Sequence, residues 1–281
     1  MKACINCGLT IPLTARFCNH CGAEQPVLVG AEGDAGAIGW DWQAPLVPQA
    51  FTAFQERLTK RQAAEQAGQD LTVYQERLYG SQFRETVQRR LEQWAEGVDV
   101  TAAETLTEAR RDLRHLTDDL LDYFFVVHCQ DLNPVVLPEE IVRYHYKEKA
   151  ELDLAQVALI YLHFEPGEHV VYTDFLRMPE RKLKHASQHF LFAERNEQLW
   201  FICDQSLLGS TKKGFAMTDR ALYWKTGLQP AQRVYYHKLF SLEKEREWLL
   251  INELYFNADP QLNTRMIWLL RRLARLYQAQ L

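Results

Sequence analysis

The sequence predicts an α+β protein built from several parts, and three patterns carry this prediction. Four cysteines lie within the first 21 of its 281 residues. Apolar residues then recur at the helical spacing of three and four between residues 50 and 130. After residue 196, short apolar runs alternate with turn residues, and an amphipathic segment follows Asp259-Pro260. We therefore expect a cysteine-rich N-terminal part, a central helical region, and an antiparallel β domain closed by a C-terminal helix.

The composition is that of an ordinary folded chain. Hydrophobic residues make up 47% and charged residues 25%, which excludes wholesale disorder. The formal net charge of −5 argues against a protein that coats nucleic acid, but leaves room for a local basic patch. No run approaches the roughly 18 apolar residues of a membrane span, and the N-terminus lacks the pattern of a signal peptide. We therefore expect a cytoplasmic protein without a transmembrane segment.

The N-terminal cysteines form two pairs, Cys4-x-x-Cys7 and Cys18-x-x-Cys21, with ten residues between the pairs. Two intervening residues let one tight turn aim both sulfurs at a single point, and two such turns supply the tetrahedral thiolates that zinc prefers. A disulfide framework would need an export signal, which this N-terminus lacks. The spacing therefore predicts one structural Zn²⁺ held by Cys4, Cys7, Cys18 and Cys21.

The same segment reads Cys-Ile-Asn-Cys-Gly and then Phe-Cys-Asn-His-Cys-Gly, which resembles the short zinc ribbons at the N-termini of many bacterial proteins. The resemblance covers residues 1–25 and implies a closed site with no open coordination position for catalysis. His20 lies inside the second pair, and because four thiolates are already present we expect it to face solvent. So short a segment cannot bury a core alone, and its metal-free form should be unfolded.

Residues 26–49 differ in composition, since glycines and prolines crowd into them, and they predict a flexible linker. Trp40 and Trp42 stand out there. We expect them to pack against the main body, with contact to a partner protein as the alternative.

Residues 50–130 predict a helical arm or bundle, with a break after Gly97. Thr101 and Glu104 have the spacing of a capping box, which would open the next helix. The polar faces carry interleaved charges of both signs, which is typical of solvated helix faces.

Residues 131–195 form a mixed connecting region in which helix and strand patterns overlap. The apolar run 152–162 predicts either a buried helix or a buried strand, and residues 165–168 predict a turn before a strand at 170–172. Residues 196–281 are the expected β domain. Its predicted strands are 199–203, 214–217, 221–225 and 233–236, with one or two more within 248–256.

The stretch from Phe201 to Lys225 resembles bacterial pleckstrin-homology-like (PH-like) domains. It has a strand that ends in Asp204, a polar glycine-containing turn, the run Gly-Phe-Ala-Met-Thr and an aromatic-rich next strand. The wider resemblance covers residues 160–280, so the domain could begin near residue 160. In bacteria such domains often accompany zinc ribbons. The resemblance implies a binding or scaffolding module rather than an enzyme, and fold alone supports no more.

No stretch carries a recognisable catalytic motif. The loop Gly209–Gly214 lacks the Lys-Ser/Thr ending and the following helix of a phosphate-binding loop. His185 and His189 would share a helical face, but they supply only half of a metal site. Cys129 and Cys203 lie in apolar runs and should be buried, unreactive thiols. We therefore expect a protein that is not an enzyme.

Two groups of basic residues could contact an anionic partner. Lys212 and Lys213 lie in the turn, and Arg271, Arg272 and Arg275 lie in the last helix, which has no acidic residue after Asp259. Packing of that helix on the sheet, with its arginines in solvent, is favoured over binding along a membrane surface.

These patterns favour a non-enzymatic bacterial adaptor that docks protein partners through the zinc ribbon, the helical arm and the PH-like domain. Self-association through the helices is open. Two alternatives also stay open. The ribbon could bind nucleic acid, although Lys2 and Arg16 are its only basic residues within residues 1–25. Alternatively, the basic turn and the last helix could bind a membrane peripherally.

Overall fold

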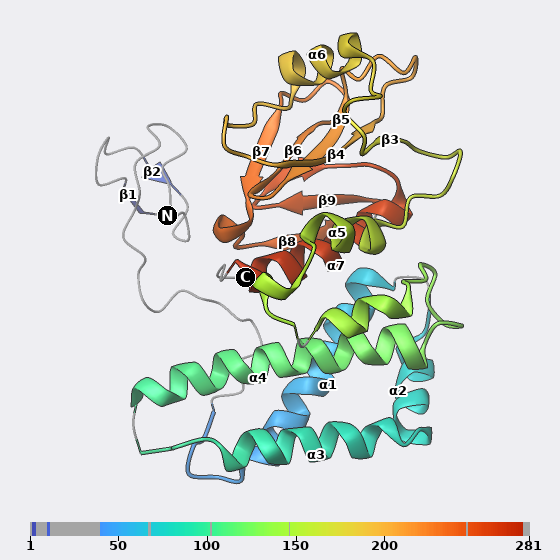
Figure 1. Cartoon of the computed structure of the whole chain (residues 1–281). Helices are drawn as coiled ribbons and strands as arrows, with labels where there is room; N and C mark the ends of the chain where they lie inside the picture. The colour runs from blue at the N-terminus through green and yellow to red at the C-terminus, as the bar shows by residue number, and fades with distance from the viewer. Residues whose placement is uncertain are drawn as a thin grey trace. The chain divides into compact units, whose positions relative to one another are not determined.

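The computed structural model describes residues 40–66, 69–101, 103–145, 147–245 and 247–277, together with the backbone of two short N-terminal strands. The chain divides into two units, Met1–Gln49 and Ala50–Leu281. Figure 1 shows the whole chain. Most of the predicted zinc ribbon and of the linker falls outside the described residues.

In the first unit, strand β1 (Lys2–Ala3) pairs antiparallel with strand β2 (Thr10–Ile11). Trp40 and Trp42 stack on each other with ring centroids 5.5 Å apart. Asp41 and Gln49 exchange two hydrogen bonds of 3.0 and 2.9 Å, which tie the residues before helix α1 (Leu46–Glu65) to its first turns.

The prediction of helices over residues 50–130 is confirmed. After α1 come α2 (Leu71–Gly80), α3 (Phe83–Glu96), α4 (Ala103–Tyr123) and a π-helical turn, η1 (Phe124–His128). Their apolar stripes supply much of the core of this helical part: Phe54, Leu58, Tyr74, Leu78, Phe83, Val87 and Leu91 are all buried. The break at Gly97 ends α3 as expected. Thr101 donates its amide and hydroxyl to Asp99 at 2.9 and 2.6 Å, while the side chain of Glu104 lies outside the described residues.

The connecting region contains more helix than strand. It contains the 3₁₀ turns η2 (Glu139–Tyr144) and η3 (Lys149–Glu151), helix α5 (Leu154–Leu162), strand β3 (Val170–Tyr172) and helix α6 (Glu180–His189). The apolar run 152–162, which fits either a helix or a strand by sequence, is therefore a helix. Asp153 caps α5 by accepting a hydrogen bond from the amide of Gln156 at 3.1 Å.

The β region consists of two antiparallel sheets. Strands β4 (Leu199–Asp204), β5 (Gly214–Thr218), β6 (Ala221–Lys225) and β7 (Gln232–Tyr235) form a five-stranded sheet with β3, in the order β3-β4-β5-β6-β7. Strands β8 (Leu242–Glu245), β9 (Trp248–Ile251) and β10 (Leu254–Phe256) form the second sheet, and a 3₁₀ turn, η4 (Tyr236–Lys238), separates the two. Because β3 joins the first sheet, the β region begins before residue 196, as the alternative start near residue 160 allows.

The last helix, α7 (Pro260–Leu276), completes an α+β fold in which helices precede antiparallel sheets, as predicted. Asp259 caps the helix and Pro260 opens it. Within the second unit, α7 contacts β8, β9 and α5 (Figure 1). Its Trp268 lies against Phe125 of the helical part, with ring centroids 6.1 Å apart. None of the helices in the described residues is long and apolar enough to cross a membrane.

Candidate functional site

The predicted zinc ligands Cys4, Cys7, Cys18 and Cys21 lie outside the described residues, so the zinc centre stays a prediction. The pairing of β1 with β2 places Ala3 opposite Thr10, and Cys4 and Cys7 fall between these two positions in the sequence. Four thiolates are the donors that zinc prefers, so the donor set in the sequence fits a structural zinc ion.

Cys129 and Cys203 are buried free thiols, as predicted. Burial raises the pKa of Cys129 to about 12 and raises the pKa of Cys203 well above its ordinary value. Neither thiol is therefore a reactive thiolate at neutral pH.

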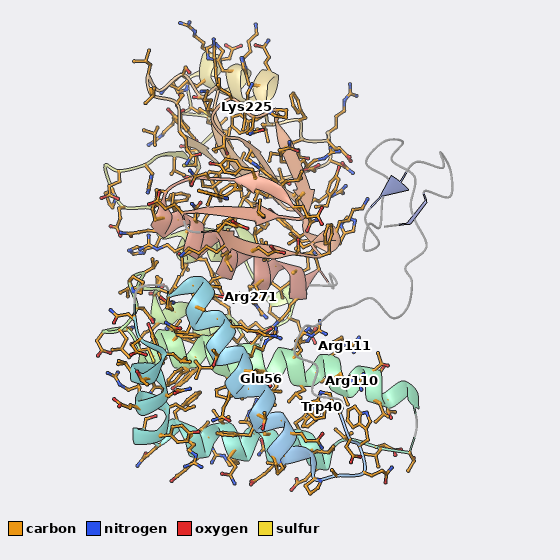
Figure 2. All side chains as sticks on the ribbon, turned by 180° about the vertical axis from the view of Figure 1, so that it is seen from behind. Trp40, Glu56, Arg110, Arg111, Lys225 and Arg271 are labelled. Carbon is orange, nitrogen blue, oxygen red and sulfur yellow. The ribbon has the colours of Figure 1, made fainter. Side chains whose placement is uncertain are left out.

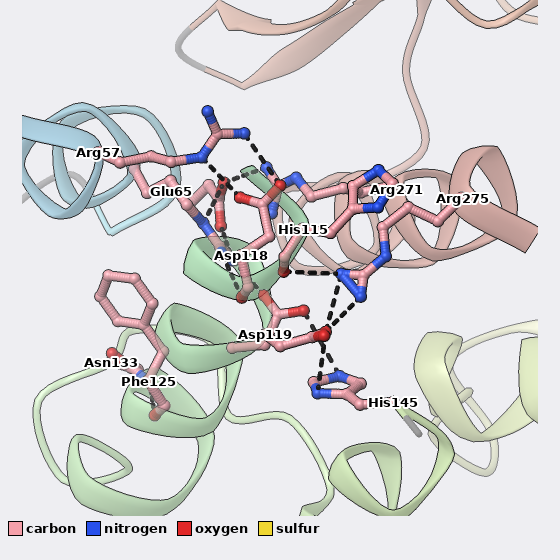
Figure 3. A network of polar contacts seen from close by, with 12 residues as sticks. Arg57, Glu65, His115, Asp118, Asp119, Phe125, Asn133, His145, Arg271 and Arg275 are labelled. Carbon is pink, nitrogen blue, oxygen red and sulfur yellow. Dashed lines mark hydrogen bonds and ion pairs between the residues drawn. The ribbon is translucent and has the colours of Figure 1, made fainter. Parts of the chain in front are cut away.

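A buried network of charged side chains joins α7 to α1 and α4, and it is drawn in Figure 3. Arg271 of α7 donates a hydrogen bond to Glu65 of α1 at 2.5 Å. Arg275 of α7 pairs with Asp119 of α4. The same network includes ion pairs between α1 and α4: Arg57 with Asp118 at 2.8 Å and Arg61 with Asp122 at 2.6 Å.

The arginines of α7 do not project into solvent, and that expectation is wrong. Arg272 is 7% exposed and donates hydrogen bonds to the main-chain carbonyls of Tyr144 and Lys147. The side chains of Arg271 and Arg275 are only 16% and 14% exposed. The physical reason is that α7 is covered on several faces, and acidic residues of α1 and α4 stand opposite its guanidinium groups. These arginines therefore serve the interior of the fold, where an external anion does not reach them.

The carboxylates of this network differ in their readiness to ionise. Burial opposes ionisation of Glu65, but Arg271 and Arg61 outweigh it and hold the pKa of Glu65 below its ordinary value. Burial likewise opposes ionisation of Asp118, but nearby arginines, Arg57 first among them, hold its pKa well below the usual range. Burial raises the pKa of Asp119 to about 7, although Arg275 opposes the shift.

Asp119, Asp122 and His145 are close enough to hold one metal ion, since three of their ligand atoms lie within 4.8 Å of one another. His145 Nδ1 is 3.6 Å from Asp119 Oδ1, and its Nε2 is 3.5 Å from Asp122 Oδ2. Figure 3 shows Arg275 and His145 meeting at the Asp119 carboxylate. A cation would have to displace Arg275 from Asp119 and Arg61 from Asp122, and the displaced guanidinium charges would repel it in this water-poor interior. We therefore interpret the group as an internal ion-pair joint.

The sequence analysis missed this joint. Its signal is an acid-rich stretch of α4, Asp118, Asp119 and Asp122, in a chain whose last helix carries arginines and no acid. Nothing in the sequence says that these two helices meet. Burial also lowers the pKa of His145 to about 4, so this histidine is neutral at physiological pH.

A second candidate site lies at one end of the five-stranded sheet. The loops 205–213, between β4 and β5, and 226–231, between β6 and β7, emerge at the same end because neighbouring strands are antiparallel. Leu207, Leu208 and Leu228 on these loops are 103%, 94% and 100% exposed. We call these two loops and the groove between them the loop-end surface. Figure 2 shows Lys225, at the end of β6, on the sheet part of the second unit.

The conformation of the 205–213 loop is fixed from inside. The Asp204 carboxylate accepts hydrogen bonds from the amide of Ser206 at 2.9 Å and from the amide and hydroxyl of Thr211 at 3.1 and 3.0 Å. Thr211 is fully buried and has a φ of +56°, which costs a β-branched residue on the order of 1–3 kcal/mol. Such a conformation persists only where its surroundings impose it, so the hydrogen bonds of Asp204 fix both ends of the segment that carries Leu207 and Leu208.

An open groove of about 500 Å³ lies between the two loops. It is lined by Gln205, Lys213, Lys225, Thr226, Gly227, Leu228, Gln229, Tyr255, Asn257 and Ala258. Lys213, which the sequence analysis proposed as an anion contact, thus lines the groove, while Lys212 is exposed beside it.

Helix α6 flanks the 205–213 loop. His185 Nδ1 lies 2.7 Å from the main-chain oxygen of Ser210, and the Nδ1 of His189 lies 2.8 Å from the main-chain oxygen of His185. The two histidines therefore share a face, as their spacing predicts, and each uses one ring nitrogen on the backbone. Lys182 lies near Gly209, where an added Cβ would be 3.9 Å from its Nζ.

Comparison with known proteins gives no relative: no protein-family model, curated protein or solved structure matches this chain. The resemblances to zinc ribbons and PH-like domains therefore remain expectations. The function must be inferred from the two sites above, one buried and one exposed.

Proposed function

We propose that this chain is a non-enzymatic, zinc-binding adaptor that docks protein partners. The observation that carries the proposal is the loop-end surface, where Leu207 and Leu208 are held in water by a loop with a buried hydrogen-bond network. Fully burying a leucine side chain is worth about 1.5–3 kcal/mol. A rigid loop that displays such side chains loses little conformational entropy on binding, which favours affinity for a partner.

The layout of the sheet part supports a PH-like docking module. Antiparallel strands followed by a closing helix are the arrangement that the PH-like resemblance of residues 160–280 implies. The sheets contact each other through aromatic rings, with Phe256 of the second sheet 5.6 Å from Phe215 and 5.8 Å from Trp224 of the first. Such a closed core provides a stable platform for loops that bind.

The chemistry of the buried groups supports a binding role over catalysis. Glu65, Asp118 and Asp122 are engaged by arginines that fix them in ion pairs. The two thiols of the described residues have raised pKa values and are buried. A nucleophile needs an accessible position and an activating base. These thiols are buried and these carboxylates are held in ion pairs, so neither group meets that requirement.

The zinc ribbon would form the second docking module. Cys4, Cys7, Cys18 and Cys21 would hold one Zn²⁺, whose contribution is to fold the segment and not to react. Elemental analysis of protein purified without chelator should find about one zinc per chain. A Cys4→Ser/Cys18→Ser variant should contain none. Zinc-free wild-type protein would refute this part of the proposal.

The adaptor function is tested by affinity purification of the tagged full chain from its native host, with nuclease treatment and mass spectrometry. A Leu207→Ser/Leu208→Ser variant is compared with a Val136→Ser control, since Val136 is 49% exposed on the helical part. We expect nuclease-resistant protein partners that the control retains and the double variant loses. Partners lost on nuclease treatment would favour nucleic-acid association, and partners unaffected by the double variant would remove the loop-end surface from the proposal.

A further inference from the structure

We infer that the groove of the loop-end surface binds an acidic segment of a partner protein. This inference rests on the adaptor function proposed above and specifies the chemistry of one partner. The groove is open to solvent, has a volume of about 500 Å³ and lies between two loops that each display exposed leucine. A volume of this size admits a few side chains of an extended chain.

Positive charge gathers on both sides of the 205–213 loop. Lys213 and Lys225 line the groove, and none of the described residues that line it is acidic. Lys212 is exposed next to them. On the other side of the loop, α6 carries three more basic residues, Arg181, Lys182 and Lys184, and one acidic residue, Glu180.

The loop is preceded by one acidic side chain, Asp204, whose single charge offsets only part of the charge of Lys212, Lys213 and Lys225. Asp204 is 8% exposed, and both of its carboxylate oxygens accept hydrogen bonds from Ser206 and Thr211. A chain with a net charge of −5 therefore presents a cationic surface at this point. Charge complementarity favours an anionic ligand here, both in the encounter and in the choice of partner.

The polar lining of the groove favours a peptide over a lipid surface. Gln205, Gln229 and Asn257 contribute amide side chains, which can both donate and accept hydrogen bonds. A bound peptide has backbone N–H and C=O groups that pair with both the acceptor and the donor atoms of these amides, whereas the phosphate and ester oxygens of a phospholipid surface only accept hydrogen bonds. The side chain of Leu228, which lines the groove, adds an apolar contact for a large side chain of the same segment. The expected ligand is therefore a segment with Asp or Glu residues next to a bulky apolar residue.

The test is a selection of random peptides displayed on phage against the immobilised full-length chain. Peptides that bind elsewhere on the chain are removed by counter-selection against a Lys213→Glu/Lys225→Glu variant. The variant should fold, because both lysines are half-buried and neither forms an ion pair within the part of the chain that the structure describes. We expect the retained peptides to be enriched in Asp and Glu beside Leu, Ile or aromatic residues. They should bind the wild type at least about tenfold more tightly than the variant. Retained peptides without acidic enrichment, or no retained peptides, would overturn the inference.

A charge-matched control variant, Arg89→Glu/Arg143→Glu, changes two exposed arginines of the helical part and should leave peptide affinity within about twofold of the wild type. If the glutamate variant at the groove fails to fold, Lys213→Gln/Lys225→Gln replaces it and should show the same direction of loss. An equal loss in the control would overturn the inference, since it would show a long-range effect of net charge.

Vesicles of phosphatidylcholine, with and without phosphatidylglycerol, are the second probe. Sedimentation with anionic vesicles that is lost in the groove variant, with no acidic peptide selected, would overturn the inference in favour of a membrane surface. If no acidic peptide is selected but Leu207→Ser/Leu208→Ser still abolishes capture of protein partners, the result supports the adaptor function and refutes the inference of an acidic ligand.

Discussion

Glu65 of α1 is the residue through which the ion-pair joint can be tested most directly. Its side chain is 3% exposed and lies between two guanidinium groups, Arg271 of α7 at 2.5 Å and Arg61 at 3.2 Å. Glu65→Gln keeps the shape of the side chain and removes its charge, so Arg271 loses this carboxylate partner while Arg61 retains Asp122. Removing one partner of a buried pair costs about 3–5 kcal/mol, a large share of the roughly 5–15 kcal/mol that stabilises a typical domain.

The measurement is urea unfolding at pH 7, followed by far-ultraviolet circular dichroism. Asp112→Asn is the control, because Asp112 is 60% exposed and lies 3.8 Å from the equally exposed Arg111, a pair worth less than about 1 kcal/mol. We expect Glu65→Gln to lose about 3 kcal/mol or more and the control to lose almost nothing. Adding Arg271→Met to Glu65→Gln should recover part of the loss, because one unpaired charge is then gone.

A loss below about 1 kcal/mol for Glu65→Gln, or a loss equal to that of the control, would refute the interpretation of a desolvated joint. The dependence of stability on pH below neutrality gives an independent check. Because the arginines lower the pKa of Glu65 in the folded state, its contribution is present above the ordinary carboxyl pKa and is lost as the pH falls below it. The wild type should therefore lose its advantage over Glu65→Gln in acid.

Three further predictions concern the same unit of the chain. Folding raises the pKa of Asp119 to about 7, so its contribution to stability is largest below the ordinary carboxyl pKa and is lost as the pH rises towards 7. Folding lowers the pKa of His145 to about 4, so its contribution is largest above about pH 6.5 and is lost as the pH falls towards 4. Between pH 4 and pH 6.5 the two effects oppose each other. Asp119→Asn should leave the His145 effect alone, so the variant should gain up to about 3 kcal/mol between pH 4 and pH 6.5, and a flat profile of urea midpoints would contradict this. Gly214→Ala should cost about 3 kcal/mol or more, because Gly214 has a φ of +141° and an added Cβ would lie 2.0 Å from a main-chain oxygen of β4; an unchanged thermal midpoint would be inconsistent with this contact. Asp204→Ala should cost about 1–3 kcal/mol and speed amide exchange across residues 205–213, because it strips the buried Thr211 of its acceptor; exchange as slow as in the wild type would argue against a loop fixed by this carboxylate.

Helices and strands with strong periodicity could be predicted from the sequence, and those with mixed polarity could not. The stripes that include Phe54 and Leu58 repeat at helical spacing and become buried in α1. Strand β8 reads Leu-Glu-Lys-Glu, with one half-buried face and one exposed face, so its short pattern contains a single apolar residue among charges. Helix α6 buries only Ala186 fully, and most of its residues are polar.

The two candidate sites were visible to different degrees. The turn with Lys212 and Lys213 could be singled out because consecutive lysines in a polar turn must lie near the surface. The neighbouring Leu207 and Leu208 could not, because an exposed leucine and a core leucine look alike in a sequence. Arg272 is buried because it donates a hydrogen bond to the main-chain carbonyl of Tyr144, more than a hundred residues away in the sequence. No sequence pattern near either residue predicts this contact.

The position of α7 changes what the helical region can be. The sequence alone leaves open how the helical arm packs on the β domain. In the structure, α7 closes the sheets and also supplies Arg271 and Arg275 to acids on α1 and α4. A buried ion network adds little net stability compared with apolar packing of equal volume, but its partners must meet in one geometry to be satisfied. The network therefore makes the mutual arrangement of α1, α4 and α7 specific.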